Sequence, residues 1–268
     1  MSRVSRRSVA VVVVVLALLA AACGSSGGKS TGSSASTTSA PKLTGSLNVF
    51  AAASLTEAFN DVKQKLASSD AGLTLTYDFA GSQALVTQIQ QGAPADVFAS
   101  ADAKNMQKLV AAGLVEAPKT FARNKLEIAV APGNPKHIAG LADLEKAGVT
   151  LVLADPSVPA GKYARQAFQK AGLPAPKPAS NELDVKSALS KLTLGEADAV
   201  VVYATDVRTA GTKVTGVAIP DDQNVVATYP IAAVKASKNL GAAEAFVEQI
   251  VGGAGSQALL ARGFLPPS

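Results

Sequence analysis

The chain has 268 residues, of which 48% are hydrophobic and 17% are charged, a composition that is typical of one or two globular domains and excludes wholesale disorder. Aromatic residues make up only 4% and Trp is absent, which argues against a sugar-stacking lectin or a protein that stacks nucleic-acid bases. A single Cys and a single His exclude an intrachain disulfide and a Cys/His metal centre.

The N-terminus has the pattern of an export signal. Three arginines precede an unbroken apolar run of 14 residues, from Val9 to Ala22. This run is too short to cross a hydrocarbon layer of about 30 Å, but it has the length of a signal-peptide core. We therefore predict a signal peptide over residues 1–22, and the pair Arg6-Arg7 leaves a twin-arginine export route open.

A lone cysteine follows the apolar run. Small residues stand directly before Cys23, which resembles a bacterial lipobox, although Leu19 lies one position further from the cysteine than is usual. We predict lipidation at Cys23 and a lipid anchor on the outer face of the cell membrane. Residues 23–44 are mostly Gly, Ser, Thr and Ala, which predicts a flexible linker between the anchor and the fold.

The charge of the mature chain is small. The formal charge of the whole chain is +5, but residues 1–22 contain three arginines and no acids, so 22 basic and 20 acidic residues remain. An excess of two positive charges is too small for binding through the phosphates of a nucleic acid. No nucleic-acid partner is predicted.

Beyond residue 44, short apolar runs alternate with segments of helical periodicity. Strands are predicted at Leu47–Ala53, Leu73–Phe79, Asp96–Ala99, Leu126–Ala131, Leu151–Ala154, Asp198–Tyr203 and Tyr229–Val234. Helices are predicted at Leu55–Leu66, Ala84–Gln91, a segment ending near Ala112, Gly161–Ala171, Val185–Leu192 and Ala242–Ile250. This alternation predicts an α/β fold with mostly parallel sheets, whose ligands bind beyond the carboxyl ends of the strands.

Four strand-to-helix turns carry small, hydroxylated or amide-exposing residues, at 51–57, 79–83, 155–163 and 181–186. In the first turn, Ser54 and Glu57 have the spacing of a capping box, and in the second Ser82 follows Gly81 and opens a helix. Each turn alone is consistent with ordinary helix capping. Together they predict a site lined by backbone amides and hydroxyl groups, which suits an anion.

The sequence lacks the motifs of a catalytic site. His137 follows a surface-type Gly-Asn-Pro-Lys segment, so we predict a solvated side chain rather than a general base. There is no Gly-x-Ser-x-Gly elbow, no phosphate-binding loop with its lysine, and no closely spaced carboxylate pair. No catalytic residue and no cofactor are predicted, and a secreted hydrolase is kept only as a remote alternative.

Five blocks of the sequence carry a resemblance to a known family, and they are Val49–Leu55, Phe79–Ser82, Gln88–Asp102, Asp155–Ala164 and Gly195–Tyr203. Together they resemble the periplasmic molybdate-binding proteins of ABC uptake systems. The resemblance covers residues 45–265 and implies a two-lobed type II periplasmic binding protein fold with the ligand between the lobes. Residues 45–124 plus 237–268 would form lobe 1, and residues 125–236 would form lobe 2.

The same resemblance implies the function and the ligand site. A monomeric receptor would capture molybdate or tungstate and deliver it to an ABC permease, and molybdenum would enter only as its oxyanion. The expected ligand-binding residues are Ser54, Ser82, Ala160, Val185 and Tyr203. Without the resemblance, Tyr203 is interpreted as a core or hinge aromatic. A receptor for sulfate or another tetrahedral oxyanion is the alternative.

Overall fold

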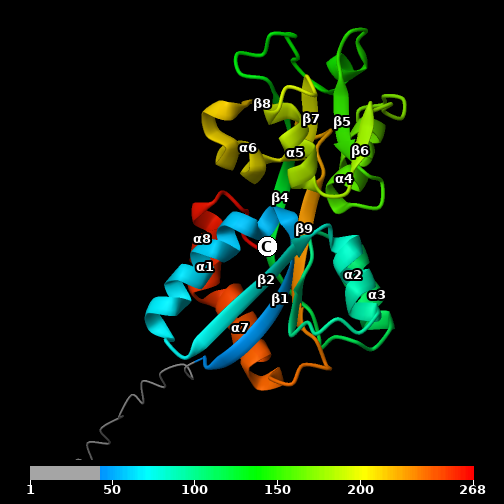
Figure 1. The fold of residues 1–268 in the computed structure, drawn as a ribbon. Helices are drawn as coiled ribbons and strands as arrows, with labels where there is room; N and C mark the ends of the chain where they lie inside the picture. Colours follow the sequence, from blue (N-terminus) through cyan, green and yellow to red (C-terminus); the bar gives the residue numbers. More distant parts are fainter. Residues whose placement is uncertain (1–42) are drawn as a thin grey trace, which may run out of the picture. The chain divides into compact units, whose positions relative to one another are not determined.

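The structure, a computed structural model, describes residues 43–268 (Figure 1). The predicted signal peptide, Cys23 and the linker up to residue 42 lie outside the described residues. Leu43 falls within the range predicted as linker, yet it is buried and its N–H donates to Asp70 Oδ1 at 2.8 Å, so it belongs to the folded part. Between residues 43 and 268, no helix combines the length and the apolar character that a membrane crossing requires.

Nine strands of the described chain pair in the order β2-β1-β3-β9-β4-β7-β5-β6, and β8 pairs with β4. They are β1 (Gly45–Ala52), β2 (Leu73–Ala80), β3 (Val97–Ala99), β4 (Lys119–Val130), β5 (Leu151–Ala154), β6 (Ser180–Glu182), β7 (Ala199–Tyr203), β8 (Thr215–Ala218) and β9 (Val226–Ala233). β1 is parallel to β2 and β3, and β5 is parallel to β6 and β7. The prediction of mostly parallel sheets was wrong for the middle of the fold, because β4 runs antiparallel to β7, β8 and β9.

The long strand β4 divides its pairing between two sheets. Residues Lys119–Lys125 pair with β9, whereas Leu126–Val130 pair with β7. We call β1–β3, β9 and the first part of β4 with their helices the first half, and the second part of β4 with β5–β8 and their helices the second half. In Figure 1 the two halves occupy the lower and upper parts of the view, and β4 and β9 run between them.

Helices cover both halves. Those of the first half are the 3-10 turn η1 (Ala53–Leu55), α1 (Thr56–Ser69), α2 (Ser82–Gln90), α3 (Ala103–Ala111), α7 (Leu240–Gly252) and α8 (Ala254–Ala261). Those of the second half are α4 (Pro159–Lys170), α5 (Val185–Thr193) and α6 (Ala204–Ala210), with 3-10 turns at Leu141–Glu145 and Gly211–Lys213. Each predicted strand and helix overlaps an observed element. The elements that the prediction missed are β6, β8, α6, α8 and the first part of β4.

The apolar core holds the helices that begin near the carboxyl ends of the strands. In α2, Leu85, Val86 and Ile89 are buried in a cluster with Phe50 of β1 and Phe98 of β3. The buried residues of α4 are Pro159, Ala160, Gly161, Ala164, Ala167 and Phe168, and those of α5 are Val185, Ala188, Leu189 and Leu192. These spacings place one face of each helix on its sheet, which fixes where the first turn of the helix lies.

Candidate functional site

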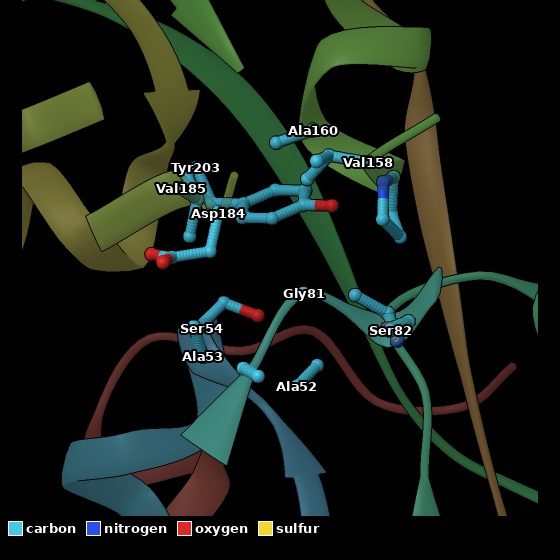
Figure 2. Close-up of a pocket in the computed structure, with 13 residues that line it drawn as sticks. Ala52, Ala53, Ser54, Gly81, Ser82, Val158, Ala160, Asp184, Val185 and Tyr203 are labelled. Atoms are coloured by element: carbon cyan, nitrogen blue, oxygen red, sulfur yellow. Dashed lines mark hydrogen bonds between the residues drawn. The ribbon is translucent and has the colours of Figure 1, made fainter. Parts of the chain in front are cut away.

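A small pocket lies between the two halves (Figure 2). It is lined by Ala52, Ala53, Ser54, Ala80, Gly81, Ser82, Ala101, Val158, Pro159, Ala160, Asp184, Val185 and Tyr203. All five residues of the predicted ligand site are in this set. The cavity measures about 10 Å³, roughly the room that one buried water needs on the same measure. In this arrangement the pocket suits one compact group.

Ser54 comes from the turn after β1. It lies in η1, its side chain is buried, and its Oγ lies 3.0 Å from the hydroxyl oxygen of Tyr229 on β9. The predicted capping box with Glu57 was wrong: α1 has Leu55 at its N-cap and no side-chain cap. Glu57 instead accepts a hydrogen bond from Lys186 of the second half, a competing partner that local spacing could not reveal.

Ser82 is the first residue of α2. Only 1% of it is exposed, and its Oγ accepts a hydrogen bond from the Ala101 N–H at 3.0 Å. Because that bond uses a lone pair of the oxygen, the hydroxyl proton stays available for donation. Ser82 is therefore oriented as a donor beside the free N–H groups of the first turn of α2.

Ala160 and Val185 line the pocket from the second half. Ala160 is the second residue of α4, after Pro159, and Val185 is the first residue of α5. The N–H groups of a first helical turn have no partner within the helix. The next residue, Gly161, packs so closely on the end of β5 that a Cβ would lie 2.2 Å from the Ala154 carbonyl oxygen. Glycine at 161 thus lets α4 begin at the pocket.

Asp184 lines the pocket and was not predicted. It is the N-cap of α5, and its Oδ1 accepts from the N–H groups of Lys186 and Ser187 at 2.8 and 2.9 Å. Its Oδ2 accepts from the Ser187 hydroxyl, and Figure 2 shows the carboxylate turned away from the hydroxyls of Ser54 and Tyr203. An acidic residue directly before a helix is a recognisable N-cap signal. This cap does not use the Val185 N–H.

Tyr203 ends β7 and is 1% exposed. Its hydroxyl points into the pocket (Figure 2) and has no hydrogen-bond partner among residues 43–268. Burial raises the pKa of this phenol well above its ordinary value, so the group remains a neutral O–H donor at physiological pH. A buried donor without an acceptor costs about 1–3 kcal/mol, and a ligand oxygen in the pocket would remove that cost.

The pocket offers neutral donors rather than cations. Among the described residues that line it there is no Lys, Arg or His. The lysines nearby are engaged elsewhere: Lys162 pairs with Asp102, and Lys186 pairs with Glu57 and Asp206. Nor do residues 43–268 hold a cluster of His, Cys, Asp and Glu that could bind a metal ion. Hydroxyls and the partial positive charge of three helix starts fit a compact oxyanion.

Two α/β halves joined by shared strands, with a small pocket between them, define a type II periplasmic binding protein fold. The solved periplasmic molybdate-binding protein of Azotobacter vinelandii has this fold, with a TM-score of 0.74 at 22% identity over 83% of this chain and 100% of that one. The sulfate-binding protein SubI of Mycobacterium tuberculosis also has a TM-score of 0.74, at 21% identity over 82% of this chain and 86% of that one.

The chain belongs to the bacterial extracellular solute-binding protein family, whose profile matches residues 47–265. It is also 41% identical to the molybdate-binding protein ModA of Mycobacterium tuberculosis over 223 residues, which cover 83% of this chain and 85% of the relative. Membership of an extracellular solute-binding family implies export from the cytoplasm. The family is one of solute-binding proteins and not of enzymes.

Proposed function

We propose that this protein captures molybdate or tungstate outside the cytoplasmic membrane and delivers it to an ABC permease. The observation that carries the proposal is the convergence of Ser54, Ser82, Ala160, Val185 and Tyr203 on one buried pocket. The 41% identity to a molybdate-binding protein over most of the chain supports this choice of ligand.

The donors of the pocket can offset the cost of removing a dianion from water. Three hydroxyls and the first residues of α2, α4 and α5 line the pocket. Each hydrogen bond from such a donor to a charged group contributes about 1.5–3 kcal/mol. Helix starts add partial positive charge without a counterion. Hydrogen phosphate carries a proton that needs an acceptor, and the Asp184 carboxylate is already occupied by α5. We therefore expect phosphate to bind weakly.

A ligand in this pocket would contact both halves, so its binding would favour a closed arrangement over an open one. The proposed moving units are the first and the second half, and β9 moves with the first half because it pairs with β3 and with the first part of β4. Small-angle scattering with and without saturating tungstate tests this motion. A decrease in the radius of gyration is expected, and identical profiles would contradict closure.

Calorimetric titration tests the ligand. Tungstate and molybdate are expected to bind with micromolar to nanomolar affinity, which corresponds to about −8 to −12 kcal/mol. Ser54→Ala and Ser82→Ala should each weaken binding, whereas Ser190→Ala, on an exposed helical position outside the pocket, should not. If a tenfold excess of sulfate displaced molybdate, the protein would be a sulfate receptor instead. If no oxyanion bound, the proposal would fail.

Lipid attachment at Cys23 and a monomeric state complete the proposal. The lone cysteine after a signal core supports the anchor. In the native host, the protein should fractionate with membranes and carry a lipid mass on its N-terminal residue. Cys23→Ser should release it to the soluble fraction, and a soluble wild-type protein of unmodified mass would contradict the anchor.

A further inference from the structure

Lys186 joins three helices by ion pairs next to the pocket. Its Nζ lies 2.8 Å from Glu57 Oε2 on α1 and 3.0 Å from Asp206 Oδ1 on α6. The Asp206 side chain is fully buried, whereas those of Lys186 and Glu57 are 25% and 31% exposed. The ammonium group is thus held between two carboxylates, one from each half of the fold.

The two ion pairs differ in what they connect. Lys186 and Asp206 both belong to the second half, and Asp206 Oδ2 also accepts from the Tyr203 N–H at 3.2 Å. This pair can persist whether the halves are together or apart. Glu57 belongs to the first half, so its bond to Lys186 exists only when the halves meet.

The Glu57–Lys186 pair lines a groove next to the pocket. A groove of about 340 Å³ runs between η1, α1 and α5, and both residues line it. Ala53 and Asp184 line this groove and also the pocket itself. The pair therefore lies beside the pocket, at a groove that shares part of the pocket wall.

We propose that Glu57 and Lys186 form a gate that holds the halves closed over the bound oxyanion and slows its release. Neither residue lines the pocket, so they act as positioning residues. The inference rests on the proposed function. A bond made only in the closed state stabilises that state relative to the open one, and therefore retards dissociation more than it affects association.

Other contacts across the halves limit the size of the effect. The Gln83 side chain donates to the Leu183 carbonyl at 3.0 Å, and Lys162 pairs with Asp102. Loss of the gate should therefore raise the release rate moderately, and binding should persist. We expect an increase of about two- to fivefold, in the range that a partly exposed ion pair can supply.

Stopped-flow measurement of tungstate release provides the test. The chain has four tyrosines and no Trp, so tyrosine fluorescence can report ligand at Tyr203. In Glu57→Gln the release rate should rise about two- to fivefold, while the association rate should change less than the release rate. Glu57→Asp, which keeps the charge, should restore part of the slow release. Raising the salt concentration should speed release from wild type more than from Glu57→Gln.

Glu196→Gln is the matched control. Lys191 and Glu196 pair at 2.5 Å within the second half, so their loss should leave release unchanged. Release from Glu57→Gln within twofold of wild type would overturn the gate, as would an equal increase in Glu196→Gln. If the wild-type protein bound no tungstate, the proposed function would be contradicted instead of the gate. Thermal melting without ligand shows whether the Glu57→Gln variant is folded.

Discussion

Gly81 of the first half faces the backbone carbonyl of Leu183 in the second, so closely that a Cβ at position 81 would lie 2.6 Å from that oxygen. The backbone of Gly81 has φ −60° and ψ 136°, angles that alanine adopts without strain. The requirement for glycine at this position therefore comes from the approach of the two halves.

Gly81→Ala should act as a wedge. The added methyl group also meets the end of the Gln83 side chain, which can rotate away, but the Leu183 carbonyl can yield only if the halves separate. We expect tungstate affinity to fall by about tenfold or more, equivalent to about 1.4 kcal/mol. The melting temperature without ligand should be unchanged.

The control for this wedge is Gly241→Ala. Gly241 lies in α7 and has no atom within 4 Å of its Cβ position, so alanine should leave affinity unchanged and raise stability by about 0.5–1 kcal/mol. If Gly81→Ala bound tungstate as tightly as wild type, the close contact between position 81 and the Leu183 carbonyl would not be needed for binding, and the prediction would be wrong.

Tyr203→Phe separates binding from folding. Removing a buried hydroxyl that has no partner among the described residues should leave the protein without ligand as stable as wild type, or slightly more stable. Removing a donor to a bound dianion should weaken binding by about 1.5–3 kcal/mol, or roughly 10- to 100-fold. Calorimetric titration and thermal melting measure the two effects.

Tyr77→Phe is the matched control for Tyr203→Phe. The Tyr77 hydroxyl is also buried without a hydrogen-bond partner in the described part of the chain, but Tyr77 belongs to β2 and does not line the pocket. Its loss should leave affinity unchanged. Equal losses of affinity in both variants would mean that the hydroxyl of Tyr203 does not contact the ligand.

Asn224→Ala should weaken the junction between β4 and β9. The buried Asn224 amide accepts from the Leu126 N–H at 3.1 Å and donates to the Leu126 carbonyl at 2.8 Å. Alanine leaves both backbone groups unpaired, so we expect the free energy of unfolding to fall by about 2 kcal/mol or more. Urea unfolding measures it. Asn239→Ala, which loses one exposed bond, should cost less than about 1 kcal/mol.

Asp61 and Arg262 connect α1 to α8 through two hydrogen bonds of 2.6 and 2.7 Å. The bonds to Arg262 lower the pKa of Asp61 below its usual 3.8, so the ionised carboxylate stabilises the fold. The contribution is fully present above about pH 4 and is lost as the pH falls through the lowered pKa.

Asp61→Asn should therefore reduce stability by about 0.5–1 kcal/mol at pH 7, since both side chains are partly exposed, and the difference from wild type should shrink below pH 4. Urea unfolding as a function of pH measures this. Asp221→Asn, which breaks the more exposed pair with Lys125, should have a smaller effect. If the loss of stability in Asp61→Asn did not change with pH, the ionised carboxylate would not be its cause.

Local sequence predicted the parts of the site that local structure determines. Ser82 and Val185 open helices as expected because turn residues and helical periodicity mark those positions directly. The role expected for Glu57 was wrong because its partner, Lys186, is 129 positions away in sequence. Asn224 was missed for the same reason, since its partner Leu126 is 98 positions away.

The elements that the sequence did not reveal are short or polar. β6 consists of Ser180, Asn181 and Glu182 and carries no apolar alternation. The first part of β4 contains Arg123, Asn124 and Lys125, which pattern reasoning treats as loop, yet its backbone pairs with β9. In both cases pairing with a distant strand decides the conformation, and no local propensity reports it.

Because one strand, β4, belongs to both sheets, neither half is an independent building block. Separating the halves would cut β4 in two, and a second half made without its part of β4 would leave β7 with an uncovered edge, the kind of surface that templates aggregation. Attempts to shrink this receptor to a minimal sensor, or to exchange one half with a relative, should therefore place their joints outside β4 and β9. Chimaeras joined in loops, with β4 and β9 left intact, should fold without exposing a strand edge.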